Sequence, residues 1–129
     1  MSGIVNGKLV DLRFKKNKDA WSKGLDAKKR ATKHDAGKPM VELVDPSFIL
    51  GVASVLTHGA KKYEPNNWRK GLPWTRIYAS TLRHLLLWAT GEDKDKDSGL
   101  SHLSHAATNL MFLITWARTH KELDDRVKL

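Results

Sequence analysis

The chain has 129 residues, the length of one domain, and its formal net charge of +9 predicts an anionic partner. It contains no cysteine, which excludes disulfide scaffolds, thiolate metal sites and cysteine nucleophiles. No apolar run approaches the roughly 20 residues that span a bilayer, and the first residues lack the pattern of a signal peptide, so we expect a cytoplasmic protein with no membrane partner.

The positive charge is concentrated in the first 33 residues. They hold ten Lys and Arg against three Asp, a net charge of +7, whereas residues 34–129 carry +2. Because so few apolar residues cannot offset the entropy of ordering, residues 1–33 are predicted to form a basic, flexible, largely irregular arm, with at most one short strand or docking segment within residues 4–14. The arm suits nucleic acid or nucleotide phosphates, and a solubilising tail explains it equally well.

Three helices are predicted in the rest of the chain, so the expected fold class is all-α, a small helical bundle. The first begins at an Asp45 N-cap followed by Pro46, and it ends at Gly59. Apolar residues then recur at helical spacing in two further segments, each bounded by Gly or Pro. The helices are expected over residues 46–59, 73–91 and 100–120.

Histidines and carboxylates are predicted to converge at one end of the last two helices. His102, His105 and Asn109 share one face of the third helix, because residues three, four and seven apart lie on the same side. His84 lies two turns before the end of the second helix, so in an antiparallel pair it stands level with residues 105–109. The loop between the helices adds three acidic residues, which are Glu92, Asp95 and Asp97.

This set of side chains predicts a divalent metal, Mg or Mn. Imidazole with carboxylate suits Mn, Zn, Fe or Ni, whereas carboxylates alone suit Mg. The predicted metal ligands are His84, Glu92, Asp95 and His102. The predicted catalytic residues are His105 and Asp97. Structural alternatives stay open: packed histidines, a solvated acidic loop in which Asp97 or Ser98 caps the third helix, or a buried pair of His84 and Asn109.

The segment 59–71 combines turn-forming residues with cations and aromatic rings. Cations there can neutralise phosphate charge and rings can stack on a base, although Trp68 can equally serve as a hydrophobic staple. A turn at residues 34–39 and the second helix each add one further cation. The predicted substrate-binding residues are Lys38, Lys62, Tyr63, Trp68, Arg69, Arg83 and Asn109.

Several short motifs occur in this chain in the same order as in a known family. They are His34–Pro39, Gly59–Tyr63, Asn67–Gly71, Arg83-His84 and Gly91–Asn109. In order and spacing they resemble the phage-associated dATP/dGTP diphosphohydrolase N-terminal domain family, over residues 33–118. The resemblance implies a purine nucleotide substrate and a phage or prophage context, hence the host cytoplasm. In that family the domain occurs alone or ahead of a MazG-like nucleotide pyrophosphohydrolase domain.

The Mg site of MazG-like enzymes is not carried over to this chain. Those enzymes are all-α and hold Mg with Glu-x-x-Glu and a later Glu-x-x-Asp. This chain contains Glu122-Leu123-Asp124-Asp125 but no Glu-x-x-Glu. The expected site is therefore the histidine–carboxylate cluster described above.

The leading hypothesis is a metal-dependent nucleoside triphosphate diphosphohydrolase or pyrophosphohydrolase that acts on the phosphate chain of purine (deoxy)nucleotides. The alternatives are a non-catalytic binder of a nucleotide or signalling molecule, and a nucleic-acid-binding accessory protein that uses the arm. A basic arm (1–33), a helical nucleotide-binding domain (34–121) and a polar tail (122–129) are expected. Three helices bury little surface, so we expect a homo-oligomer, a dimer, with the sites at or near its interface.

Overall fold

The computed structural model describes residues 2–5, 8–11 and 30–129. It divides the chain into two compact units, Met1–Leu43 and Val44–Leu129, which we describe separately.

The described residues of the first unit form two paired β-strands and a 3₁₀ turn. Strands β1 (Ser2–Val5) and β2 (Lys8–Asp11) pair antiparallel, with Ser2 opposite Asp11, and the turn η2 covers Val41–Leu43. Two short strands therefore stand where the sequence predicted at most one. The basic residues between 12 and 29 lie outside the described residues, so nucleic-acid binding by the arm stays a prediction.

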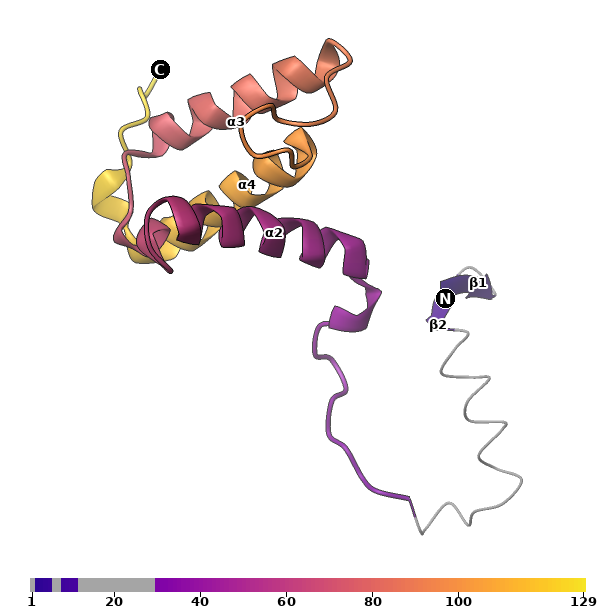
Figure 1. Cartoon of the computed structure of the whole chain (residues 1–129). Coiled ribbons are helices and arrows are strands. Elements are labelled where there is room, and N and C mark those ends of the chain that lie inside the picture. Colours follow the sequence, from indigo (N-terminus) through magenta and orange to yellow (C-terminus); the bar gives the residue numbers. More distant parts are fainter. Residues whose placement is uncertain (1, 6–7, 12–29) are drawn as a thin grey trace. The chain divides into compact units, whose positions relative to one another are not determined.

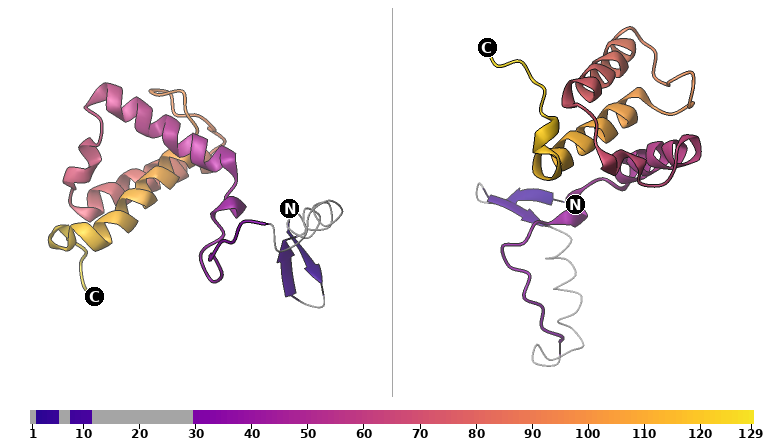
Figure 2. Two further views of the ribbon diagram at one scale, coloured as in Figure 1. Left: turned by 90° about the horizontal axis from the view of Figure 1, so that it is seen from below. Right: turned by 90° about the vertical axis from the view of Figure 1, so that its left-hand side faces the viewer.

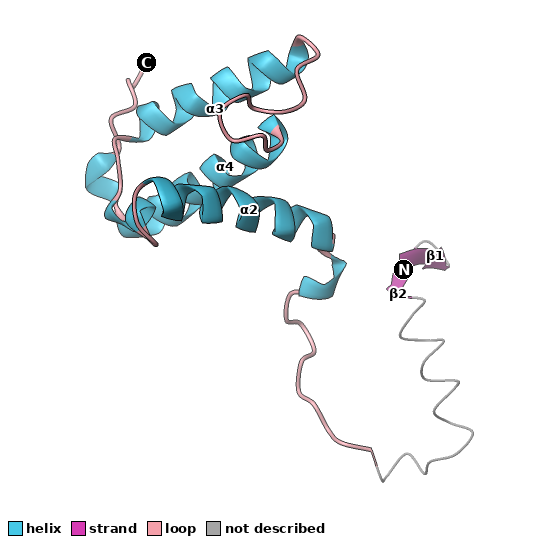
Figure 3. Ribbon diagram, in the orientation of Figure 1, coloured by secondary structure: helices cyan, strands magenta, loops and turns pink. Residues whose placement is uncertain are grey.

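The second unit confirms the all-α prediction with three helices (Figure 3). These are α2 (Pro46–Lys62), α3 (Trp74–Ala89) and α4 (His102–Thr119). Helix α4 lies between the other two and packs against both (Figures 1 and 2). Within the described part of the chain, no helix is long and apolar enough to cross a membrane.

The helix boundaries follow from specific caps. Asp45 accepts a hydrogen bond from the Ser47 amide at 3.2 Å, as an N-cap should. The predicted end of this helix at Gly59 is wrong, because the Tyr63 amide donates to the Gly59 carbonyl at 2.9 Å and the helix continues to Lys62. A glycine ends a helix by adopting a positive φ, and the chain does so at Gly91 (φ 97°), just beyond α3.

An aromatic stack holds the loop that joins α2 and α3 against α4. The Trp116 side chain is 1% exposed, and its Nε1–H donates to the Trp68 carbonyl at 3.1 Å. The Phe112 ring stacks on both tryptophans, with ring centroids 4.8 Å from Trp68 and 5.7 Å from Trp116. Burial of these rings holds the 3₁₀ turn Asn67–Lys70 (η3) against the middle of α4.

Residues near the C-terminus cap the beginning of α3. Asp125 accepts from the Thr75 amide at 2.9 Å, which satisfies one of the unpaired N–H groups of the first helical turn. The Arg126 guanidinium lies 5.0 Å from the centre of the Trp74 ring. The end of the predicted polar tail thus contributes a cap to the helix that carries His84.

Gly51 marks the close approach of α2 and α4. A methyl group at this position would lie 2.6 Å from Ser104 Oγ. We expect Gly51→Leu to lower the free energy of unfolding by about 1–3 kcal/mol, because the larger side chain forces the two helices apart. Urea denaturation followed by circular dichroism measures the change.

Ala53→Leu is the matched control, because it places the same side chain on the same helix at an exposed position. We expect it to change stability by no more than about 0.5 kcal/mol. Equal losses in the two variants would contradict close packing at Gly51.

Candidate active site

The histidines and carboxylates of the candidate site come from α3, α4 and the loop between them. The loop folds back on the start of α4: the Asp95 amide donates to the Leu100 carbonyl at 2.8 Å, and the His102 amide donates to the Asp93 carbonyl at 2.9 Å. Gly99 adopts a φ of 72°, which favours glycine and permits the tight turn. This geometry directs carboxylates of the loop toward the histidines of both helices.

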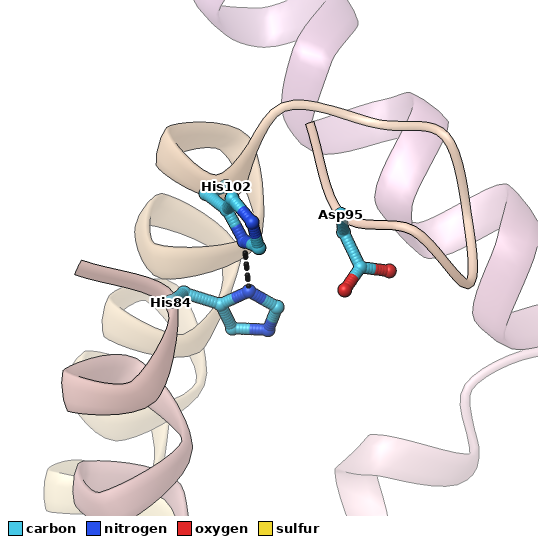
Figure 4. A group of neighbouring side chains, drawn as sticks. All are labelled: His84, Asp95 and His102. Carbon is cyan, nitrogen blue, oxygen red and sulfur yellow. Dashed lines mark hydrogen bonds between the residues drawn. The ribbon is translucent and has the colours of Figure 1, made fainter. Parts of the chain in front are cut away.

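A fully buried imidazole lies at the centre of the site. His102 is 0% exposed, and its Nε2 lies 2.7 Å from Glu92 Oε2. A carboxylate only accepts hydrogen bonds, so His102 Nε2 carries the proton that it donates to Glu92. In the neutral form of this ring Nδ1 then has the lone pair. It lies 2.9 Å from His84 Nδ1, which donates to it (Figure 4).

A second hydrogen-bonded chain runs from His105 to the loop. Ser98 Oγ donates to Asp95 Oδ2 at 2.9 Å, and the Ser98 amide donates to the same oxygen at 2.9 Å. His105 Nε2 lies 2.7 Å from Ser98 Oγ and donates to it, which leaves the lone pair of the neutral ring on Nδ1. The His105 and His84 rings stack with centroids 4.5 Å apart and an interplanar angle of 3°. His84 therefore connects the two series of hydrogen-bonded side chains, through its bond to His102 and its stacking on His105.

The pKa values of both the bases and the acids of the site are lowered, by burial for the histidines and by hydrogen bonds for the carboxylates. Burial lowers the pKa of His84 and of His105, so both rings are unprotonated near pH 7. The hydrogen bond from His102 lowers the pKa of Glu92. Burial alone would raise the pKa of Asp95, but the two hydrogen bonds from Ser98 outweigh it and the pKa is lowered. The site thus combines unprotonated imidazoles with ionised carboxylates.

This donor set fits a divalent cation. One nitrogen each from His84 and His102 and one oxygen from Asp95 lie within 4.8 Å of one another, on three different segments (Figure 4). Two imidazoles and a carboxylate are typical ligands of Mn and Zn, and less typical of Mg. Glu92 is not part of this group, because it bonds the opposite nitrogen of His102. That is the position of a carboxylate that orients a ligating histidine.

A cavity of about 800 Å³ opens beside the cluster. Its walls come from the end of α2, the following loop, α3 and α4, and His84, Asp95 and His105 contribute to its lining. This volume lies within the usual range of small-molecule sites. Five further predicted residues also line it, namely Lys62, Tyr63, Trp68, Asp97 and Asn109.

The predicted residues differ in how they meet this cavity. Tyr63 is 66% exposed, so its ring is available to a ligand. Trp68 instead stacks on Phe112, and the Arg69 guanidinium lies 4.5 Å from the centre of its ring. Asn109 donates to Ser80 Oγ at 3.2 Å and does not pair with His84. Asp97 lies 4.0 Å from Lys62 Nζ, across the mouth of the cavity.

Two predicted substrate-binding cations do not line the cavity, and a third belongs to the first unit. Arg69 and Arg83 are exposed and do not line the cavity. Lys38 belongs to the first unit, where the Lys38 amide closes a turn on the Asp35 carbonyl at 3.1 Å.

Two cavity residues, His58 and Arg76, escaped the sequence analysis. His58 is the fourth histidine of this region. It lies one residue before Gly59, where the first helix was predicted to end. Arg76 lies in the first turn of α3, one turn before the Ser80 that holds Asn109. The helical spacing of Arg76, Ser80 and His84 was the available signal.

A further Glu-x-x-Asp, absent from the sequence prediction, lies at the site. Glu92-Asp93-Lys94-Asp95 has this spacing and lies at the site. The segment Glu122–Asp125 is engaged elsewhere, since Asp125 caps α3 and the hydrogen bond from Arg126 lowers the pKa of Asp124 to about 2.

The fold and the site define a small all-α domain with a histidine–carboxylate cluster in the wall of a cavity. The chain belongs to the family described as dATP/dGTP diphosphohydrolase, N-terminal, whose sequence pattern it matches over residues 28–126. A dATP/dGTP diphosphohydrolase of Salmonella phage PMBT28 is 39% identical over 94 residues, which are 73% of this chain and 32% of the phage protein. The chain thus spans about a third of that relative. No solved structure matches it.

The hydrogen bond to Glu92 predicts a single tautomer for His102. At pH 8 we expect the ring to carry its proton on Nε2, because the Glu92 carboxylate accepts there. Long-range ¹H–¹⁵N NMR correlations of the imidazole distinguish the two tautomers. Glu92→Ala should give a mixture of both, whereas Asp93→Ala, on an exposed neighbour, should leave the Nε2–H form intact. A wild-type ring protonated on Nδ1 would contradict the arrangement.

The lowered pKa values of His84 and His105 predict that stability depends on pH. The folded state binds fewer protons than the unfolded state below the ordinary histidine pKa of 6.5, so stability rises with pH. This contribution is complete above pH 6.5 and is lost as the pH falls below it. In a chelating buffer we expect the melting temperature to decrease as the pH is lowered from 7.5 to 5.5.

The double variant His84→Gln, His105→Gln should show a smaller fall, measured by calorimetry. The control His34→Gln changes an exposed histidine of the first unit and should keep the wild-type slope. A slope that is the same in all three proteins would show that these rings titrate normally.

Proposed function

We propose that this domain binds a purine deoxynucleoside triphosphate in the cavity and hydrolyses its phosphate chain with a divalent cation. The observation that supports this proposal is the convergence of His84, Asp95 and His102 in the wall of a cavity large enough for a nucleotide. The substrate class comes from the relative, which is named a dATP/dGTP diphosphohydrolase.

The lining of the cavity suits the two ends of such a ligand. Lys62 and Arg76 both line it, and their charges would neutralise the phosphates. Tyr63 offers an exposed ring on which a purine can stack. Asn109, held by Ser80, offers its side-chain oxygen to a hydrogen-bond donor of the ligand.

His84, Asp95 and His102 would hold the cation, with His102 Nδ1 giving up its hydrogen bond from His84, and Glu92 would keep the proton of His102 on Nε2. A bound divalent cation polarises a phosphoryl oxygen and favours ionisation of a bound water. His105 is the proposed base. Its Nε2 is held by Ser98, and its pKa is lowered by burial, so Nδ1 is free to accept a proton from the attacking water near pH 7.

A second candidate function is nucleotide binding without hydrolysis. It is favoured by one observation: the matched region is only 32% of the phage protein, so the reaction in that protein could depend on its remaining two thirds. In that case the same cavity would hold the ligand, and its histidines would have a structural role.

The experiment incubates the full chain with dATP or dGTP and Mn²⁺ or Mg²⁺ and separates the products by anion-exchange chromatography. We expect turnover, and at least about a 100-fold loss of rate in His84→Ala and in Asp95→Asn, because each removes a ligand of the cation. Arg118→Ala, on the far end of α4, is the control and should keep the wild-type rate.

Binding of dGTP in the presence of EDTA separates the two functions. Stabilisation by the nucleotide with no product under any condition would replace hydrolysis with binding alone. The absence of both stabilisation and product would overturn both functions.

A further inference from the structure

Helix α3 has an apolar stripe that faces away from the cavity. Its members are between 37% and 65% exposed and are Tyr78, Leu82, Leu85 and Leu86. Successive residues of a helix turn by about 100°, so these positions share one side. The cavity is lined by Arg76, Ile77, Ser80 and His84, which lie around the opposite side of the same helix.

Helix α4 has a matching stripe. Leu103, Leu110 and Ile114 are 45%, 50% and 74% exposed, and their separations of seven and four residues place them on one side of the helix. The residues of α4 that line the cavity are His105, Asn109, Phe112 and Trp116, and they lie on another side.

The two stripes adjoin each other. Helices α3 and α4 are antiparallel neighbours, and both contribute one side to the same cavity (Figures 1 and 2). The sides that point away from the cavity therefore lie next to each other on the back of the pair. Neither stripe contains a charge, because the only Lys, Arg, Asp or Glu residues of the two helices are Arg76, Arg83 and Arg118. We call these seven apolar residues the back face.

The back face has the size of a protein interface. The exposed fractions of its seven residues correspond to roughly 700 Å² of surface, against about 800 Å² per partner in a standard interface. The surface is also free of charge, as the centre of an obligate interface usually is.

We infer that the back face binds the back face of a second copy of this chain. In the described part of the chain only three apolar residues are buried, which are Ile77, Ala106 and Trp116. So small a core leaves much apolar surface to be buried by association, and the area of the back face is close to what each partner of a standard interface buries. Two antiparallel helix pairs that meet face to face form a four-helix bundle with two-fold symmetry.

This arrangement places the cavities on the outside of the dimer. Each cavity lies on the side of α3 and α4 that faces away from the bundle, so both would stay open to ligand. The inference does not depend on the proposed reaction, since it rests on exposed side chains alone.

The test exploits the absence of cysteine from the chain. Light scattering coupled to size exclusion should give the mass of two copies for the wild-type protein at tens of micromolar. Leu82→Cys and Leu110→Cys, near the middle of the two stripes, should then form intermolecular disulfides under mild oxidation. Thr57→Cys, exposed on α2, is the control and should stay uncrosslinked.

A charged substitution gives the complementary result. Leu110→Glu should yield the mass of one copy, whereas Leu50→Glu, at an exposed apolar position of α2, should keep the mass of two. A monomeric wild-type protein would overturn the inference. So would a dimer in which neither cysteine of the back face crosslinks more than Thr57→Cys, because the copies would then meet elsewhere.

Discussion

The buried imidazole of His102 determines the arrangement of the candidate site. A polar ring without exposure must satisfy both nitrogens inside the protein, since each unpaired polar group costs about 1–3 kcal/mol. Glu92 accepts a hydrogen bond from Nε2, and His84 donates one to Nδ1. The first contact fixes the start of the acidic loop, and the second fixes the rotation of α3 relative to α4. The same two contacts also determine which nitrogen of His102 has a lone pair.

The charges around the cavity come from different segments. Asp95 and Asp97 come from the loop between α3 and α4, whereas Lys62 and Arg76 come from the end of α2 and the start of α3, and Glu64 adds one acid from the loop after α2. Residues 34–129 have a net charge of only +2, so the cavity and not an overall charge would attract a ligand. A cation on the acidic side and phosphates on the basic side would each meet their counterpart. This layout suits a small anion with its metal better than a nucleic-acid duplex.

Local signals explain why the helices were predictable from the sequence. Asp45 followed by Pro46 is a strong start, and apolar residues recur at helical spacing in α3 and α4. Gly59 does not end α2, because a glycine permits the end of a helix without requiring it, and the Tyr63 amide still donates to the Gly59 carbonyl.

Counting turns from Gly91 also placed His84 level with His105, and the structure shows their rings stacked. Tertiary contacts decided the rest. The sequence could not distinguish Glu92, which bonds the far nitrogen of His102, from Asp95, which faces the cavity. The occupation of the Trp68 ring by Phe112 and the exposure of the back face also depend on packing, which no local pattern specifies.

The continuity of the site along the chain has a consequence for folding. Every residue of the histidine–carboxylate cluster lies between positions 84 and 105, in two adjacent helices and their loop. Contacts of such short sequence separation close with little loss of chain entropy and tend to form early. The cluster can therefore assemble as soon as the α3–α4 hairpin does, before α2 docks to complete the cavity. A change near the end of α2 or in the loop that follows it would then alter the ligand that the domain accepts while leaving the cluster itself in place.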